Sequence, residues 1–291
     1  MINIFKRKTI NPMIENLDKI PKVLYKYRSF DQHDYCLKYA TRGEAYFASA
    51  RDFNDPFENH FIPKSKLLEL KGEALTIYLR EKAFMHFPDA SESKLAELIE
   101  IGKEQQRLLK NGDPRGFEAV LETQYQNFGI LSLTAIPDSI PMWAYYCDSH
   151  KGLCIGLSTS KIAEHQQKLI PENQLLILHK VKYQNKMLEY CVDVGKNGMS
   201  KRDLELLERT LYTKSNSWKH EQEYRLLFYD QPSFTYTFGT DSVTEVIIGL
   251  RSSEENQIRL IDKLNAEHSD AKIRRVVMSR NKYKIEIEDL N

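Results

Sequence analysis

Short apolar runs rich in β-branched and aromatic residues recur along most of this chain, at irregular intervals. Such runs are typical of buried strands, and they occur at 23–27, 45–48, 129–134, 152–157, 175–183, 223–229, 243–250, 272–278 and 283–287. Helical segments interrupt them without a fixed order, at about 33–41, 200–213 and 253–267. Gly43 is expected to end the first helix in a left-handed conformation. This irregular mixture indicates an α+β fold and not a regular βαβ succession.

A different pattern occupies residues 64–128, where apolar residues recur at helical spacing. Three amphipathic helices are expected there, at 65–83, 91–110 and 115–127, with Pro88 and Gly112-Asp113-Pro114 between them. We therefore expect one α+β domain over 1–291 with a helical insertion at 64–128. The insertion is where a lid or a partner surface would lie.

The charge balance argues against a strongly basic surface, because 42 Lys and Arg face 41 Asp and Glu, for a net charge of +1. Only a local basic patch is compatible with this balance. The four cysteines form no Cys-x-x-Cys pair, so neither a zinc site nor a thioredoxin-like motif is predicted. No run reaches the ~18–20 apolar residues of a membrane span, and the N-terminus MINIFKRKTI is too short and too charged for an export signal. These features favour a cytoplasmic protein.

Four polar clusters are the candidates for chemistry, because the sequence contains no P-loop, dinucleotide fingerprint, zinc-protease motif or hydrolase serine motif. The first cluster, Lys26-Tyr27-Arg28-Ser29, lies at the end of the first expected strand. A cation there would bind an anion or a ribose. The alternative is an arginine at a sheet edge that pairs with a carboxylate.

The second and third clusters combine aromatic and polar residues. Tyr46 precedes the segment Asn54-Asp55-Pro56-Phe57-Glu58, in which Asn54 and Asp55 before a proline predict a turn as readily as a ligand site. Trp143 and His150 lie within one segment before a strand and would line a pocket. Burial in the core explains Trp143 and Tyr146 of this segment equally well, and a single histidine is more often structural than catalytic.

The fourth cluster is Trp218-Lys219-His220-Glu221-Gln222-Glu223-Tyr224-Arg225. In an extended segment, alternate residues share a face, so Glu221, Glu223 and Arg225 would line up together. A carboxylate on such a strand can hold a ribose hydroxyl and stabilise an oxocarbenium-like transition state. The alternative is an ion pair between Glu223 and Arg225 on an exposed strand.

In this order the four clusters resemble a bacterial family known as domain of unknown function 2971. The resemblance rests on Leu24 to Arg28, Phe53 to Glu58, Trp143 to Gly152, Trp218 with Glu221 to Arg225, and Val246 to Gly249. It covers nearly the whole chain apart from the helical insertion, and it implies no activity.

A second resemblance concerns ADP-ribosyltransferases, especially bacterial toxins that modify thymidine in DNA. Their first strand carries His or Arg after an aromatic residue, and the short helix that follows ends near a glycine, as from Arg28 to Gly43 here. Tyr46-Phe47-Ala48 resembles a strand of the polymerase-type members. Glu223 opens an apolar strand, as their catalytic Glu does, and Glu221-Gln222-Glu223 resembles the Glu-x-Glu of arginine-directed members. Arg28 stands where many members have His, and Ser158-Thr159-Ser160 is the candidate for their Ser-Thr-Ser strand.

This resemblance implies an ADP-ribosyltransferase-like split β-sandwich and NAD-dependent transfer of ADP-ribose. Glu223 and Arg28 would be the catalytic residues, and Glu221 would orient the target. The residues that would bind NAD are Tyr27, Arg28, Ser29, Tyr46, Asn54, Trp143 and His150. The acceptor would be a nucleic acid (RNA or DNA) or a protein. A bacterial toxin or anti-phage effector of this kind would need a neutralising protein partner, for which the helical insertion is a docking site.

Two other functions remain open at this point. A metal-dependent nuclease would use Asp55, Glu58, Glu221 and Glu223 as Mg²⁺ ligands, although no lysine follows the Glu-x-Glu pair in the pattern common among nucleases. A regulatory module without catalytic activity would use the same charges as structural ion pairs.

Overall fold

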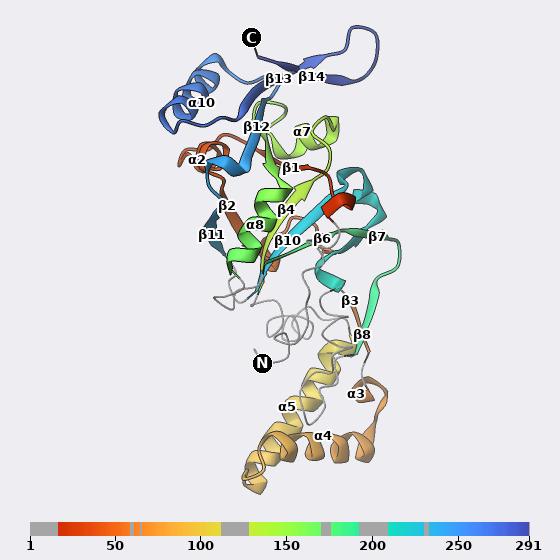
Figure 1. Cartoon of the computed structure of the whole chain (residues 1–291). Coiled ribbons are helices and arrows are strands. Elements are labelled where there is room, and N and C mark those ends of the chain that lie inside the picture. The colour runs from red at the N-terminus through yellow and green to blue at the C-terminus, as the bar shows by residue number, and fades with distance from the viewer. Residues whose placement is uncertain are drawn as a thin grey trace. The chain divides into compact units, whose positions relative to one another are not determined.

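The computed structural model describes residues 17–58, 61–64, 66–111, 128–169, 176–191, 209–229 and 233–290. Helices and strands follow one another in mixed order, and most strands join one large mixed sheet (Figure 1), so the expected α+β class is confirmed. The expected helix at 115–127 and most of the one at 200–213 lie outside the described residues. None of the described helices combines the length and the apolar character that crossing a bilayer requires.

The chain divides into two compact units. Unit 1 comprises residues 1–53, 127–183 and 214–291, and unit 2 comprises 54–126 and 184–213. The expected helical insertion at 64–128 therefore falls almost entirely within unit 2, which also takes in the later segment 184–213.

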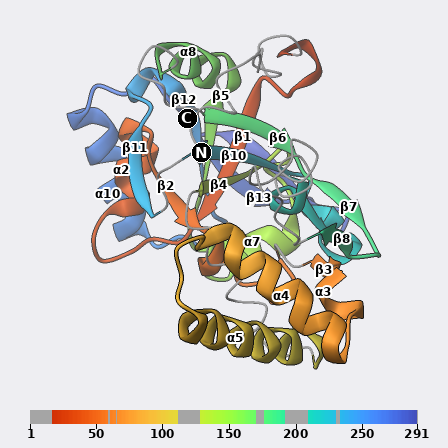
Figure 2. The same cartoon turned by 90° about the horizontal axis from the view of Figure 1, so that it is seen from below.

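Unit 2 contains the helices α3 (Lys66–Glu69), α4 (Gly72–His86) and α5 (Glu92–Lys110), and a short parallel pair, β3 (Phe61–Lys64) and β8 (Leu188–Cys191). Figures 1 and 2 show α4 and α5 side by side. They pack around Leu75, Leu79 and Ile99. Ser91 caps α5, because its hydroxyl accepts a hydrogen bond from the Lys94 N–H. The helix expected at 91–110 is thus present, whereas the one expected at 65–83 is divided into α3 and α4, with a break before Gly72.

Unit 1 contains a ten-stranded sheet in which the described pairs are antiparallel, except the parallel pair β12–β13. The main path is β11-β2-β4-β1-β5-β12-β13-β14, and β10 lies between β4 and β6. The strands are β1 (Val23–Arg28), β2 (Glu44–Ser49), β4 (Phe128–Thr134), β5 (Leu153–Ser158), β6 (Leu176–Lys180), β10 (Glu223–Tyr229), β11 (Phe234–Thr237), β12 (Val243–Ile248), β13 (Lys272–Met278) and β14 (Ile285–Asp289).

The sheet divides at β4. One edge of β4 pairs with β10 along its whole length. The other edge is shared, because β2 pairs with it at Gly129 and Ile130 whereas β1 pairs with it at Thr134. One arm therefore continues through β2 and β11, and the other through β1, β5, β12, β13 and β14.

Apolar side chains fill both faces of the sheet, as the near-continuous apolar run of β5 predicts. Leu153, Ile155 and Leu157 pack in a cluster with α2 (Tyr35–Arg42), α8 (Thr159–Leu169) and α10 (Glu254–Ala266). Cys154 packs on the other face in a cluster with α7 (Ile140–Tyr146) and β14. Gly43 ends α2 with φ 63°, which confirms the expected left-handed stop.

Several local expectations are wrong. The sequence did not indicate α7 and α8, and the strand expected at 175–183 is interrupted at Val181, where β6 gives way to β7 (Lys182–Gln184). Ser158-Thr159-Ser160 does not form a strand, because Ser158 ends β5 and Thr159 begins α8. The hydroxyl of Ser158 accepts a hydrogen bond from the Lys161 N–H, which favours the start of a helix there.

Candidate functional site

The start of β10 and the first half of β1 lie in the same row of the sheet. The pairing register aligns Tyr25 on β1 with Thr134 on β4, and Thr134 with Glu223 on β10. Two strand spacings separate Tyr25 from Glu223, about 10 Å in all. Arg28, the last residue of β1, lies three residues beyond Tyr25. The register therefore places Glu223 beside the first half of β1, whereas Arg28 lies about 10 Å farther along that strand.

A buried cluster of charges surrounds Glu223. Lys214 Nζ lies 2.7 Å from Glu221 Oε2 and 3.2 Å from Glu223 Oε2, and Arg225 Nε lies 2.8 Å from Glu223 Oε1. None of these four side chains is more than 5% exposed. The alternative of a Glu223–Arg225 pair on an exposed strand is therefore wrong: the ion pair exists, but it is buried.

The two glutamates meet at Lys214 because the chain turns between them. Glu221 ends the 3₁₀ segment η4 (Asn216–Glu221), Gln222 is left-handed with φ 45°, and β10 begins at Glu223. The Thr134 hydroxyl donates to the Glu221 carbonyl at 2.6 Å, which fixes this turn to the end of β4. The extended alternation expected over 221–225 is thus wrong, because Glu221 precedes the strand.

Opposing effects act on the pKa values in this cluster. Burial raises the pKa of Glu223 above its ordinary value, while Lys214 acts in the opposite direction. Burial disfavours the charged form of Lys214, but Glu223 and Glu221 outweigh it, so the pKa of Lys214 is raised. The Tyr146 hydroxyl donates to Glu221 Oε1 at 2.7 Å, which adds a third donor to the pair of carboxylates.

Lys26 is the cation of the first strand that reaches this cluster. Its Nζ donates to the Ser132 carbonyl at 2.8 Å. Burial, followed by the charge of Arg28, lowers the pKa of Lys26 to about 7, although Glu223 and Glu221 act to raise it. Lys26 lies within the first sequence cluster, but the motifs there assigned a role to Arg28 and not to Lys26.

Arg28 has no ion pair or side-chain hydrogen bond to any residue that the structure describes. Its Nε is buried without a partner, and so is the hydroxyl of Tyr39, a residue of α2 that is 1% exposed. The two side chains interact electrostatically. Asp31 is near, but its oxygens accept hydrogen bonds from N–H groups at the start of α2. Within the described ranges, the alternative of an Arg28–carboxylate pair at the sheet edge is wrong.

Tyr27 and Ser29 point toward α7 and the loop before it. The Tyr27 ring contacts the Trp143 ring edge-on at 5.2 Å, and its hydroxyl donates to the Ile136 carbonyl at 3.0 Å. Ser29 Oγ donates to the backbone carbonyl of Tyr146, whose hydroxyl reaches Glu221. Trp143 is fully buried in the apolar cluster that also contains Tyr27. This burial agrees with the core role that was the alternative interpretation of its sequence.

His150 lies in an unusual stretch of backbone. Asp148, Ser149 and His150 all have positive φ angles, of 42°, 55° and 73°. The His150 N–H donates to the Trp143 carbonyl at 3.1 Å. Burial, and then the charge of Arg251, lower the pKa of His150. Consecutive left-handed residues without glycine are strained, and such strain is concentrated at functional sites.

Two predicted NAD-binding residues are not brought to this cluster by any described contact. Tyr46 lies on β2 opposite Thr235 and is 42% exposed. Asn54 belongs to unit 2, together with Asp55 and Glu58 of the proposed metal site. Asp55 Oδ1 accepts a hydrogen bond from the Phe57 N–H, which confirms the turn expected there. The described residues contain no group of three or more His, Cys, Asp or Glu that could hold a metal ion.

Lys214 and Tyr146 are the cluster residues that the sequence did not indicate. Lys214 lies on β9 (Thr213–Ser215), immediately after a segment that was expected to be helical. No motif surrounds it, so only the tertiary structure shows its contact with Glu221 and Glu223. Tyr146 belongs to the third sequence cluster, where its ring suggested burial.

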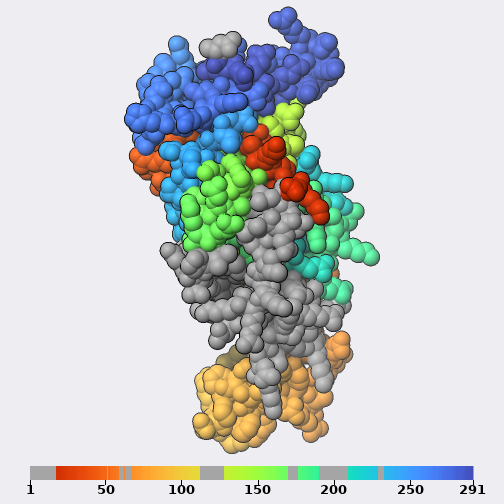
Figure 3. Space-filling view, viewed as in Figure 1, coloured from red at the N-terminus to blue at the C-terminus, as the bar shows by residue number. Residues whose placement is uncertain are grey.

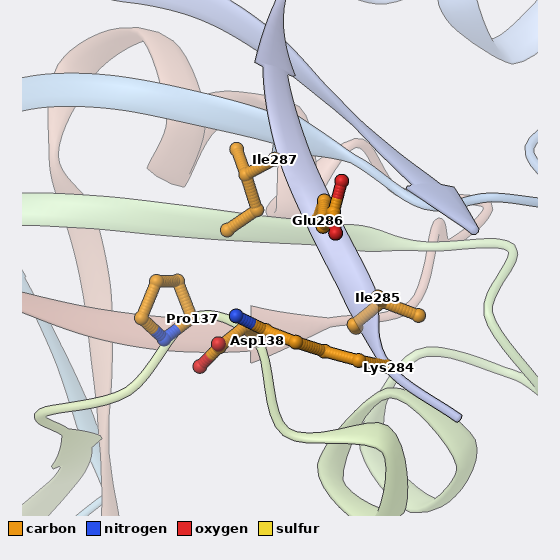
Figure 4. A pocket seen from close by; sticks show the side chains of 6 residues that line it. All are labelled: Pro137, Asp138, Lys284, Ile285, Glu286 and Ile287. Carbon is orange, nitrogen blue, oxygen red and sulfur yellow. The ribbon is translucent and has the colours of Figure 1, made fainter. Parts of the chain in front are cut away.

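A shallow pocket of about 280 Å³ lies elsewhere on unit 1 (Figure 4). It is lined by Pro137, Asp138, Lys284, Ile285, Glu286 and Ile287. None of the candidate site residues lines it, and its volume is below the usual range for ligand pockets.

Comparison with known families gives one match. Residues 142–226 match a family described as protein of unknown function (DUF2971). The resemblance to this family is confirmed over that segment. The part of this chain that matches, residues 142–226, includes Trp143, His150, Lys214, Glu221 and Glu223. It does not include β1. No curated protein and no solved structure matches the chain.

Proposed function

We propose that the chain is an NAD-dependent ADP-ribosyltransferase built on an ADP-ribosyltransferase-like split β-sandwich. The observation that carries this proposal is the strand register, in which Tyr25, Thr134 and Glu223 form one row across β1, β4 and β10. The buried acid then lies about two strand spacings from β1, the strand that carries Lys26 and Arg28. The division of the sheet at β4 supports the fold assignment.

Glu223 is the central catalytic residue of the proposal. As the substrate, NAD supplies the ADP-ribosyl group and loses nicotinamide. The Glu223 carboxylate would accept a hydrogen bond from a ribose hydroxyl and stabilise the positive charge that develops on the sugar. The role requires the ionised carboxylate, and the ion pairs with Lys214 and Arg225 oppose the burial that raises the pKa of Glu223. Glu221 would orient the acceptor.

Arg28 would bind a phosphate or the nicotinamide ribose of NAD. A buried polar group without a partner is uncommon and calls for an explanation such as a missing ligand. Arg28 Nε and the Tyr39 hydroxyl are two such groups, and both are donors that suit phosphate oxygens. Tyr46, with its exposed ring, would stack on nicotinamide. The acceptor would be a nucleic acid or a protein, and a toxin or anti-phage role follows from this activity.

Incubation of the purified protein with labelled NAD tests the proposal, with bacterial lysate or RNA as acceptor and with or without EDTA. We expect label transfer that EDTA does not affect. Glu223→Gln should reduce transfer about 100-fold or more, as when a transition-state contact is removed. Glu288→Gln is the matched control, because Glu288 is an exposed strand glutamate, and it should transfer label at the wild-type rate.

The same experiment separates the other functions. Cutting of RNA that EDTA abolishes, without label transfer, would support a metal-dependent nuclease and overturn the proposal. Silence in both assays would favour a regulatory module. Circular dichroism of Glu223→Gln checks that lost transfer reflects chemistry and not unfolding, and a folded variant with full activity would also overturn the proposal.

A further inference from the structure

The tip of the β13–β14 hairpin is a compact basic loop. The Ser279 N–H donates to the Lys284 carbonyl at 3.0 Å and closes the turn. The residues from Arg280 to Lys284 are all exposed, and Tyr283 is fully exposed. This hairpin projects from one end of unit 1 (Figures 1 and 3).

The cations of the tip differ from those on the strands of the same hairpin. On β13, Arg274 pairs with Glu245 and Asp289, and Arg275 lies 3.8 Å from Glu288. Arg280, Lys282 and Lys284, by contrast, have no ion pair with any described residue, and the segment 279–284 contains no acid. The tip therefore carries three positive charges that form no ion pair within the described part of the chain.

Tyr283 lies between two of these charges. A fully exposed aromatic ring gains nothing from burial in the folded chain, whereas a ring between lysines can stack on a base while the lysines contact phosphates. We propose that the tip, through Tyr283 with Arg280, Lys282 and Lys284, binds single-stranded nucleic acid. An acidic protein fits less well, because protein interfaces are depleted in lysine. A membrane surface fits less well, because lipid-binding basic clusters have about 4–8 cations.

The register places this tip at the end of the sheet where β1 finishes. Arg28 pairs with Leu153, Leu153 with Ile248, and Ile248 with Arg275. The turn begins four residues beyond Arg275, so the tip leaves the sheet at the end where β1 finishes. Glu223 lies in the row of Tyr25 and Lys272, seven residues along β13 from the start of the tip. The proposed binding therefore does not depend on the proposed function.

Fluorescence anisotropy with labelled single-stranded DNA and RNA of about twelve nucleotides tests the inference on the full chain, without NAD. Three phosphate contacts predict that log K falls with log salt with a slope of about −2. Tyr283→Ala should weaken binding about tenfold or more, whereas Tyr283→Phe should bind as the wild type does. Replacing Arg280, Lys282 and Lys284 with Gln should abolish the salt dependence. Phe84→Ala, at an exposed aromatic residue of unit 2, is the control and should bind normally.

The inference is overturned if the wild type fails to bind the oligonucleotides, or if Tyr283→Ala binds as tightly as Tyr283→Phe. Binding to phosphatidylserine vesicles but not to oligonucleotides would also overturn it. Glu223→Gln should bind nucleic acid normally, so a chain that binds but transfers no label contradicts only the proposed enzyme. A chain that transfers label to protein but binds no oligonucleotide contradicts only this inference.

Discussion

Replacing Lys214 with Met removes the cation that joins the two buried glutamates. Its Nζ lies 2.7 Å from Glu221 and 3.2 Å from Glu223, and all three side chains are at most 5% exposed. Removing one partner of a buried ion pair costs about 3–5 kcal/mol, because the other charge is left uncompensated. Arg225 still pairs with Glu223, and Tyr146 still donates to Glu221. We therefore expect the free energy of unfolding to fall by about 3 kcal/mol, the lower end of this range.

Urea unfolding followed by tryptophan fluorescence measures this loss. The chain has two tryptophans, Trp143 and Trp218, and both belong to unit 1, so the signal reports the unit that contains the cluster. Trp218 is a direct probe, because Lys214 Nζ lies 4.9 Å from its ring centroid. With a slope of about 3 kcal/mol per M, the midpoint should fall by roughly 1 M urea.

Two further variants test the physical cause. Lys161→Met removes an exposed lysine that pairs with Glu164 and Asp241, and it should change the free energy of unfolding by less than about 1 kcal/mol. Glu221→Gln in the Lys214→Met background removes a buried carboxylate that has lost its cation. It should restore at least about 1 kcal/mol of the free energy of unfolding. A loss below about 1 kcal/mol for Lys214→Met, or no recovery in the double variant, would refute the assignment of a buried, energetically coupled cluster.

Other outcomes follow from single positions. The pKa of Lys26 is lowered to about 7 in the folded protein, whereas the ordinary lysine value is 10.5. Between pH 7 and pH 10 the unfolded chain therefore binds a proton that the folded protein does not bind. The free energy of unfolding should consequently rise with pH over this range. Urea titrations should show this rise reduced in Lys26→Met, and an equal rise in both proteins would contradict the lowered pKa. A Cβ at Gly249 would lie 2.3 Å from the His150 carbonyl oxygen, so Gly249→Ala should lower the free energy of unfolding by about 1–3 kcal/mol. A Cβ at Gly156 would lie 2.8 Å from its nearest neighbour, a side-chain atom. Gly156→Ala should therefore lower the free energy of unfolding by less than Gly249→Ala does in the same urea titration. A larger loss for Gly156→Ala would contradict the close packing at Gly249.

The sequence alone determined the α+β class and the approximate bounds of most strands of the large sheet, although it did not indicate β3, β8, β9 or β11. Runs such as 223–229 and 272–278 are strands with those bounds, because local apolar patterning reflects which residues a sheet buries. Gly43 could be identified as a helix end because left-handed backbone strongly favours glycine. Helix α7 was missed because its aromatic and proline-containing sequence has no clear helical periodicity.

Glu221, Glu223 and Arg28 could be proposed from residue type and order, but their partners could not. Lys214 carries no motif, and its contact with the two glutamates depends on the left-handed turn at Gln222 and on the pairing of β10 with β4. Lys26, and not Arg28, is the first-strand cation with a hydrogen bond beside the acidic pair. Only the tertiary structure decided these points, because burial and charge pairing depend on strand register between segments that lie far apart in the sequence.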